Sequence, residues 1–312
     1  MYPVNWNHKP YYSLEAYFKE YFGKKIYKIA LDAGMTCPNR DGTLGTRGCI
    51  FCSEGGSGDF ACSLEDLTDT IAKHKDRIPF IAYFQSFTNT YAPVDTLNHI
   101  FRQALELPDC AGISVATRPD CFSPAIYTLF KDLKSDYPDK LIWIELGLQT
   151  IHEKTAAYIR RGYTLSCFEQ CMKELHKLQI PVIIHVILGL PGESHTDMIE
   201  TVTYLNHFHP FGMKLQLLHI LKDTDLALDF KKKTFEALTK EEYIDLIADC
   251  LEQISPEIVI HRLTGDGPKD LLIAPLWSTN KKDVLNSIHK KMKERNTIQG
   301  KYYYDTGRCY NL

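Results

Sequence analysis

Short apolar runs rich in β-branched residues alternate with segments of helical periodicity along this chain of 312 residues. The predicted strands cover residues 26–31, 80–84, 112–116, 141–147, 182–188, 214–220 and 258–263. The predicted helices between them lie near residues 65–78, 94–106, 123–135, 165–178, 195–208 and 240–254. This alternation is typical of parallel βα units, and right-handed crossovers curl such units into a barrel or partial barrel. We therefore predict an α/β fold, a partial (β/α)6-type TIM barrel with a C-terminal α/β extension.

The two ends of the chain stand apart from this pattern. We expect an N-terminal basic and aromatic extension at 1–25, the barrel at 26–255 and a C-terminal extension at 256–312. The last helix of that extension, about 281–295, carries a strongly basic exposed face. The chain contains no low-complexity segment, no internal repeat and no linker that would divide the barrel.

Composition excludes several classes of protein. The chain is 44% hydrophobic and 24% charged, as is usual for globular proteins, and its net charge of −3 gives no global attraction to nucleic acid. The N-terminus lacks the basic start and apolar stretch of a secretory signal, and no apolar run reaches the ~18 residues that span a membrane. We therefore expect a cytoplasmic protein without a membrane partner. Its ten cysteines should be reduced there, and clustered cysteines then indicate a metal.

Chemically unusual residues follow the predicted strands, on the loops where barrel enzymes keep their sites. They are Gln85 and Asn89 after the second strand, Arg118 after the third, Glu145 on the fourth and Gln149 at its end, Gly189, Pro191 and Gly192 after the fifth, Gln216 and His219 at the end of the sixth, and Arg262 and Asp266 at the end of the seventh and after it. A chain without a site would distribute such residues over both ends of its strands.

Three cysteines cluster after the first strand. Eleven residues separate Cys37 from Cys49, and two separate Cys49 from Cys52. Three thiolates are one fewer than a closed structural zinc site or a fully ligated iron–sulfur cluster requires, so one iron of a cluster would stay open. The alternatives are a zinc knuckle completed by a nearby side chain, such as Cys62, and three unrelated cysteines.

Eight strings of residues match a known family in order. They are LDAGMTCPNRDGTLGTRGCIFC, YFQSFTNTYAP, SVATRPDC, ELGLQT, RRGYT, ILGLPGES, LHILKDT and RLTGDGP. On these strings the chain resembles the radical SAM superfamily, most closely its YtqA/YhcC-type (MnmL-like) subgroup, which is related to the coproporphyrinogen dehydrogenase and elongator catalytic-subunit branches. One departure is the gap of eleven residues between the first two cysteines, where three is the most familiar spacing. This long gap is typical of the subgroup.

The resemblance implies the chemistry of the site. Cys37, Cys49 and Cys52 would hold a [4Fe–4S] cluster whose open iron binds S-adenosylmethionine (SAM), and cleavage of SAM would give a 5′-deoxyadenosyl radical that takes a hydrogen atom from the substrate. A reducing electron donor, such as flavodoxin or ferredoxin, is implied as a partner.

The resemblance also places roles on further residues. Candidates for SAM binding are Glu145, Gln149, Arg160, Arg161, Gly189, Pro191 and Gly192. For Arg160 and Arg161 the alternative is a pair of solvated arginines, and for the glycines it is an ordinary βα turn. Candidate catalytic residues are Gln85, Arg118 and His219, and candidate substrate residues are Asn89, Lys214, Gln216, Arg262 and Asp266. His185 could line the substrate or lie hydrogen-bonded in the barrel interior.

The implied substrate is the wobble uridine of tRNA, and the implied reaction converts 5-carboxymethylaminomethyl-(2-thio)uridine to 5-aminomethyl-(2-thio)uridine. Arg118 or Arg262 could bind the carboxylate of that substrate. The predicted RNA surface includes Lys281, Lys282, Lys290, Lys291 and Lys293, for which a solvated helix face is the alternative. Two other functions stay open: a radical SAM enzyme acting on a small metabolite or a protein, and a non-catalytic zinc-binding module.

Overall fold

The computed structural model describes residues 6–56, 58–63, 66–73, 78–265 and 267–304, which form two compact units. The first, here named the cysteine unit, comprises Lys24–Gly147 and Gly162–Val182. The second, named the C-terminal unit, comprises Met1–Gly23, Leu148–Arg161 and Ile183–Leu312. In the part of the chain that is described, no helix is long and apolar enough to cross a membrane.

The cysteine unit is built on parallel strands in the order β2-β1-β3-β4-β5. Their bounds are β1 Tyr27–Asp32, β2 Cys62–Ser63, β3 Phe80–Phe84, β4 Cys110–Thr117 and β5 Leu141–Gln149, whose last two residues belong to the C-terminal unit. Every residue of β3 is buried. A strand inside a parallel sheet is covered on both faces, and its sequence is accordingly a continuous apolar run.

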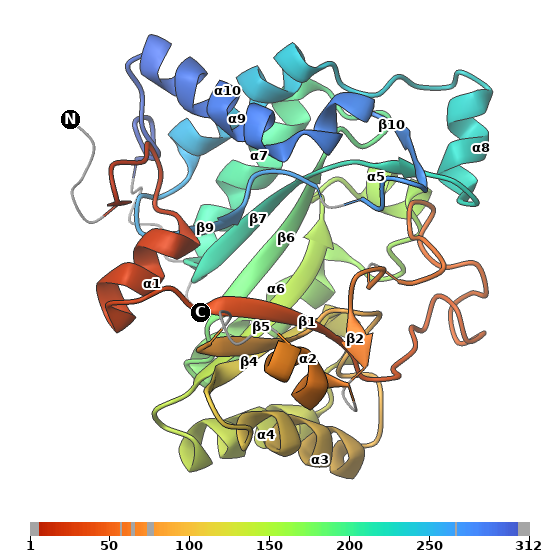
Figure 1. Cartoon of the computed structure of the whole chain (residues 1–312). Helices are drawn as coiled ribbons and strands as arrows, with labels where there is room; N and C mark the ends of the chain where they lie inside the picture. The colour runs from red at the N-terminus through yellow and green to blue at the C-terminus, as the bar shows by residue number, and fades with distance from the viewer. Residues whose placement is uncertain (1–5, 57, 64–65, 74–77, 266, 305–312) are drawn as a thin grey trace. The chain divides into compact units, whose positions relative to one another are not determined.

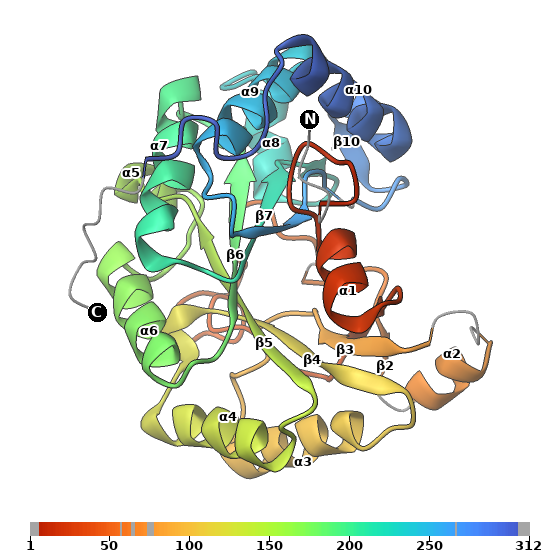
Figure 2. The same ribbon diagram turned by 90° about the vertical axis from the view of Figure 1, so that its left-hand side faces the viewer.

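Helices cover these strands. They are α2 Leu67–Lys73, α3 Val94–Leu105, α4 Pro124–Asp136 and α6 Leu165–Lys177, with a 3-10 turn, η3, at Pro119–Cys121. Helices α3 and α4 lie side by side against one face of the strands (Figures 1 and 2). Phe101 of α3 packs between Phe84 of β3 and Phe130 of α4, with ring centroids 5.1 and 5.6 Å apart. These rings join strand and helices into one core.

The C-terminal unit contains the parallel strands β6 Val182–Leu188, β7 Gly212–Leu217 and β9 Val259–Arg262, in that order. The first residue of β6 belongs to the cysteine unit. A separate pair, β8 Ile220–Leu221 and β10 Leu272–Ala274, is antiparallel.

Six α-helices of the C-terminal unit are described: α1 Leu14–Phe22, α5 Glu153–Tyr158, α7 His195–Leu205, α8 Asp225–Lys231, α9 Lys240–Gln253 and α10 Lys281–Glu294. Two 3-10 turns, η4 Asn206–Phe208 and η5 Leu276–Thr279, complete it. Helix α9 packs between α7 and α10, and α1 lies beside β9 (Figure 1). Capping boxes at Ser194 and Thr239 fix where α7 and α9 begin.

The predicted βα rhythm is confirmed at each of its seven strands, with shifts at the ends. Strands β3 and β6 have the predicted bounds. The predicted strand 214–220 was wrong at its end, because β7 stops at Leu217 and Ile220–Leu221 pairs instead with β10. The sequence did not reveal α1, α5, α8 or the short strands, since elements of this length carry too little periodicity to be recognised.

Candidate functional site

The cysteine loop follows β1 and folds back on itself. Asn39 accepts a hydrogen bond from the Gly48 amide (2.7 Å), and Pro38 accepts one from the Leu44 amide (2.8 Å). The Cys52 amide donates to the Cys49 carbonyl at 3.1 Å. These bonds close the eleven-residue gap into a compact loop, so the unusual spacing brings Cys49 back toward Cys37.

Arg40 braces this loop from within. Its guanidinium donates to the carbonyl oxygens of Cys52 (3.3 Å) and Ser53, and it lies 5.6 Å from the ring of Phe87. Gly48 has a φ of +73°, and a Cβ there would lie 3.0 Å from the Arg40 Nε. Glycine is therefore needed at this position for both its backbone and its space.

The three thiols are half-buried, and two of them have hydrogen-bond donors beside them. Asn39 Nδ2 donates to Cys49 Sγ at 3.4 Å, and Arg118 Nη1 donates to Cys37 Sγ at 3.9 Å. Burial first, and then the nearby Cys52, raise the pKa of Cys49 to about 12, whereas Asn39 and Arg118 act to lower it. Metal ligation requires thiolates, and N–H donors aimed at sulfur stabilise them. This donor set fits an iron–sulfur cluster.

The spacing of the thiols argues against a closed zinc site. Tetrahedral zinc with Zn–S bonds of ~2.3 Å places its sulfur ligands only ~3.8 Å apart. Among the residues that are described, the one group of three His, Cys, Asp or Glu donors within 4.8 Å of one another is His152, Asp197 and Glu200. Cys62 Sγ contacts the Ala30 carbonyl instead (3.5 Å). A cluster does not require its sulfur ligands to lie so close together, because they bind different irons.

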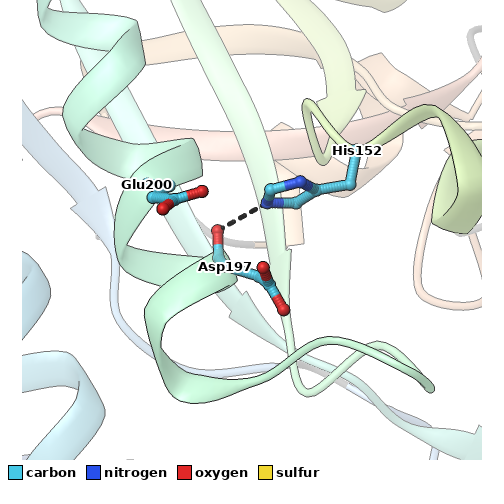
Figure 3. A group of neighbouring side chains, drawn as sticks. All are labelled: His152, Asp197 and Glu200. Carbon is cyan, nitrogen blue, oxygen red and sulfur yellow. Dashed lines mark hydrogen bonds between the residues drawn. The ribbon is translucent and has the colours of Figure 1, made fainter.

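His152 lies beside Asp197 and Glu200 of helix α7 (Figure 3). His152 Nε2 bonds to the Asp197 carbonyl (2.9 Å), and the Asp197 carboxylate accepts from the amide and hydroxyl of Ser194, both at 2.7 Å. A helix N-terminus favours negative charge and disfavours a cation. Because the Asp197 carboxylate is engaged in the capping box of α7, we do not interpret this group as a metal site.

Arg118 lies beside the cysteine loop, next to Cys37. Its guanidinium forms a two-point pair with Asp120, at 2.9 and 2.7 Å, and lies 5.1 Å from the ring of Tyr163. A Cβ on Gly162 would lie 2.9 Å from Asn39 Oδ1 and 3.1 Å from Arg118 Nη2. Sequence reasoning selected Arg118 but missed Asn39, although its place two residues after Cys37 puts an amide within reach of a thiolate.

Glu145 is fully buried in β5 and has its partners within the cysteine unit. It forms an ion pair with Lys28 of β1 and accepts a hydrogen bond from Ser114 Oγ at 2.7 Å. The Lys28 ammonium also lies 4.4 Å from the centre of the Tyr83 ring. Burial of the carboxylate is therefore compensated inside the chain. Lys28, which looks like part of the basic N-terminal region in the sequence, points into this network.

Asn89 fastens the loop after β3 to β4. It is buried, and its Nδ2 donates to the carbonyls of Phe84, Ser86 and Ala116 at 3.0–3.1 Å. The Gln85 amide donates to the Leu31 carbonyl at 3.0 Å. Beside this loop, a cavity of about 450 Å³ is lined by Thr90, Tyr91, Ala92, Asp120, Cys121, Phe122, Ser123 and Ile126.

The two candidate arginines of the C-terminal unit differ in role. Arg161 is almost fully buried and donates to the Thr150 carbonyl (2.7 Å) and to Glu153 (3.1 Å), so it holds the loop after β5. Arg160, which is more exposed, pairs with Asp225 of α8 at 2.5 Å. Both arginines therefore have partners in the chain, and the alternative of two merely solvated arginines is wrong.

In the described part of the C-terminal unit, Gln149 Oε1 and Glu193 Oε1 are among the buried side-chain atoms without a hydrogen-bond partner. Thr150 and Thr155 also bond to the Glu193 carboxyl, and these bonds act to lower its pKa. Gln149 also has a φ of +72°, and burial raises the pKa of Glu193. Gly189 and Gly192 turn the chain nearby with φ of +90° and +87°. Orphaned acceptors beside such turns fit a ligand with N–H or O–H donors, such as the ammonium and hydroxyl groups of SAM. Sequence reasoning did not select Glu193.

The remaining predicted residues lie on β7, β9 and α10, except Asp266, which is outside the described residues. His219 follows β7, where Gly265 and Gly267 pack against its ring. On α10, the predicted RNA-facing lysines Lys281, Lys282, Lys290 and Lys293 are exposed, whereas Lys291 pairs with Asp245 of α9 at 2.8 Å.

Comparison with known proteins identifies relatives over nearly the whole chain. Residues 42–205 match the Radical SAM superfamily, and residues 210–294 match the Radical_SAM C-terminal domain. YtqA of Bacillus subtilis is 42% identical, covering 97% of this chain and 95% of its own, and YhcC of Escherichia coli is 31% identical, covering 89% and 91%. The structure of Elp3 from Methanocaldococcus infernus matches with a TM-score of 0.64 at 16% identity, covering 91% of this chain and 68% of its own. The last match confirms the predicted fold class, an α/β fold of the radical SAM kind.

Proposed function

The chain belongs to the radical SAM superfamily, and from that premise we propose that it modifies the wobble uridine of tRNA. It is a radical SAM enzyme, and its cofactors are a [4Fe–4S] cluster and SAM. When bound, they supply a 5′-deoxyadenosyl radical that abstracts a hydrogen atom from the substrate. The proposed reaction converts 5-carboxymethylaminomethyl-(2-thio)uridine to 5-aminomethyl-(2-thio)uridine, with flavodoxin or ferredoxin as electron donor.

The proposed cluster ligands are Cys37, Cys49 and Cys52. Asn39 and Arg118 donate to two of their sulfurs, which holds the thiolates in place and reduces the negative charge around them. Two N–H groups of Arg118 already donate to the Asp120 carboxylate. Arg118 is therefore better suited to support the cluster than to bind a substrate carboxylate.

For SAM we propose Gln149 and the turn formed by Gly189, Pro191 and Gly192, together with Glu193. The orphaned oxygens of Gln149 and Glu193 support this choice. Glu145, Arg160 and Arg161 each already bond to a partner in the chain, so we leave them out of this proposal. Their role in SAM binding stays a prediction.

The observation that carries the tRNA proposal is an exposed aromatic surface on α1. The rings of Tyr17 and Tyr21 lie 4.6 Å apart, and Tyr21 is 65% exposed. Exposed Lys19 lies on the same helix. Aromatic rings beside cations stack on unpaired bases and attract phosphates, as recognition of an anticodon loop requires. The family resemblance implies the same substrate.

The test is a reaction with reconstituted enzyme. We expect reduced enzyme, SAM and bulk tRNA to yield 5′-deoxyadenosine while carboxymethylaminomethyluridine declines and aminomethyluridine appears, measured by mass spectrometry of nucleosides. If 5′-deoxyadenosine forms only when metabolites or protein replace tRNA, the tRNA proposal is wrong. The cavity beside Asp120 would then be the place to look for a small substrate.

A charge-reversal pair tests the RNA surface of α10. We expect Lys290→Glu with Lys293→Glu to weaken tRNA binding and to lower the slope of log affinity against log salt by about one to two, because each lost phosphate contact removes up to about one unit. Both lysines are exposed. Lys131→Glu with Lys154→Glu, which changes the net charge equally on exposed lysines of other helices, is the matched control. Equal slopes for the two double variants would show that the RNA surface does not lie on α10.

A further inference from the structure

Basic side chains line up across three neighbouring strands of the C-terminal unit. The register pairs His185 of β6 with Lys214 of β7, and Lys214 with Arg262 of β9. Strands β6, β7 and β9 lie side by side in Figure 1. Residues in register on parallel strands project from the same face of the sheet. These three side chains therefore form a row on one face.

A bulge in β9 is what brings Arg262 into this row. Met213 pairs with Ile260, but the next residue, Lys214, pairs with Arg262, so His261 is skipped. Regular pairing would place His261 opposite Lys214 and turn Arg262 to the other face. Bulges of this kind redirect side chains and are common beside functional sites.

His219 adds a buried donor near the end of β7. Its Nε2 is buried and has no hydrogen-bond partner in the described ranges of the chain. A Cβ on Gly265 would lie 2.4 Å from the His219 ring, and one on Gly267 would lie 2.5 Å from it. Glycines thus allow the loop after β9 to pack directly on the imidazole.

Lys281 adds another cation within electrostatic range of His219 and Arg262. It is the first residue of α10, where the helix dipole also favours negative charge. Lys281 is exposed overall, but partial burial of its side chain, and then Arg262, lower its pKa. Burial, Lys281 and Arg262 together lower the pKa of His219 to about 4. Groups that repel one another in this way gain stability when an anion binds between them.

We propose that Arg262, Lys281 and His219 form an oxyanion-binding site that takes a phosphate or carboxylate group of the substrate. The guanidinium presents two parallel donors, which matches either oxyanion. The ammonium supplies charge, and the neutral imidazole donates one hydrogen bond. The identity of the substrate rests on the proposed function, whereas oxyanion binding as such does not.

The first test measures binding of inorganic phosphate by calorimetry, using reconstituted enzyme saturated with SAM. We expect Lys281→Gln and Arg262→Gln each to weaken phosphate binding about tenfold, the effect of removing one charge-assisted hydrogen bond. Lys131→Gln, which neutralises an exposed lysine on α4, should leave the affinity unchanged. Absence of phosphate binding, or equal loss in the Lys281 and Lys131 variants, would refute the site.

A second measurement distinguishes the two sources of the oxyanion. The nucleoside 5-carboxymethylaminomethyluridine carries the carboxylate without phosphate, and an unmodified anticodon stem–loop carries phosphates without the carboxylate. If Lys281→Gln weakens binding of the nucleoside but not of the stem–loop, the site takes the carboxylate. If it weakens binding of the stem–loop but not of the nucleoside, the site takes a phosphate. Unchanged binding of both contradicts the proposal. Phosphate binding with no reaction on tRNA would refute the proposed function and leave the site standing.

Discussion

Replacing Cys49 with alanine is expected to abolish cluster binding. Anaerobic reconstitution should give about four iron and four sulfide per chain for the unchanged protein and almost none for Cys49→Ala, because two remaining thiolates cannot hold the cluster. Cys49 lies beside Asn39 and close to Cys52, at the centre of the donor set. Iron and sulfide analysis, with the visible absorption of the oxidised cluster, measures the effect directly. Production of 5′-deoxyadenosine should disappear with it.

Cys62→Ala is the matched control for this experiment. Cys62 is half-buried on β2, and its sulfur contacts the Ala30 carbonyl rather than the other thiols. We expect this variant to keep its iron. An unchanged iron content in Cys49→Ala would contradict the assignment of the ligands, and equal loss in both variants would make Cys62 a fourth ligand.

Replacing Lys28 with methionine is expected to destabilise the protein by about 3–5 kcal/mol, because the buried Glu145 carboxylate then loses its counter-ion. Glu145 is fully buried, and 17% of the Lys28 side chain is exposed. Methionine keeps most of the volume of the lysine stem, so the loss reports charge rather than a cavity. Urea unfolding, followed by circular dichroism, measures the free energy of unfolding.

The double variant Lys28→Met with Glu145→Gln is the control. It removes both charges and keeps the length of both side chains, so we expect it to be more stable than Lys28→Met alone. Ser114 can still donate to the glutamine oxygen. If the single and double variants were equally stable, the ion pair would not be the source of the effect.

The cysteine loop shows how a spacing far from the familiar one still brings Cys49 near Cys37. The additional residues between Cys37 and Cys49 form a hydrogen-bonded loop that Arg40 braces through its guanidinium. The loop also carries Asn39 to the sulfur of Cys49. The additional residues therefore contribute a hydrogen-bond donor to the Cys49 thiol as well as length.

Much of this protein can be determined from its sequence because the information is local. Apolar runs such as residues 80–84 and 182–188 indicate buried parallel strands, and both were predicted with the bounds that the structure shows. The cysteine loop is equally local, since the residue types and their spacing lie within one segment. Periodicity and spacing depend on neighbours along the chain, which is why a single sequence reveals them.

The partners of the polar residues were decided only by the tertiary structure. Lys28 meets Glu145 across 117 positions of sequence, Arg118 turns to Asp120 and Cys37, and Arg161 is buried to hold carbonyls of its own loop. Strand register determines which side chains become neighbours, as the bulge that places Arg262 opposite Lys214 shows. A shift of one residue along a strand reverses the face of every side chain, and no local pattern records that choice.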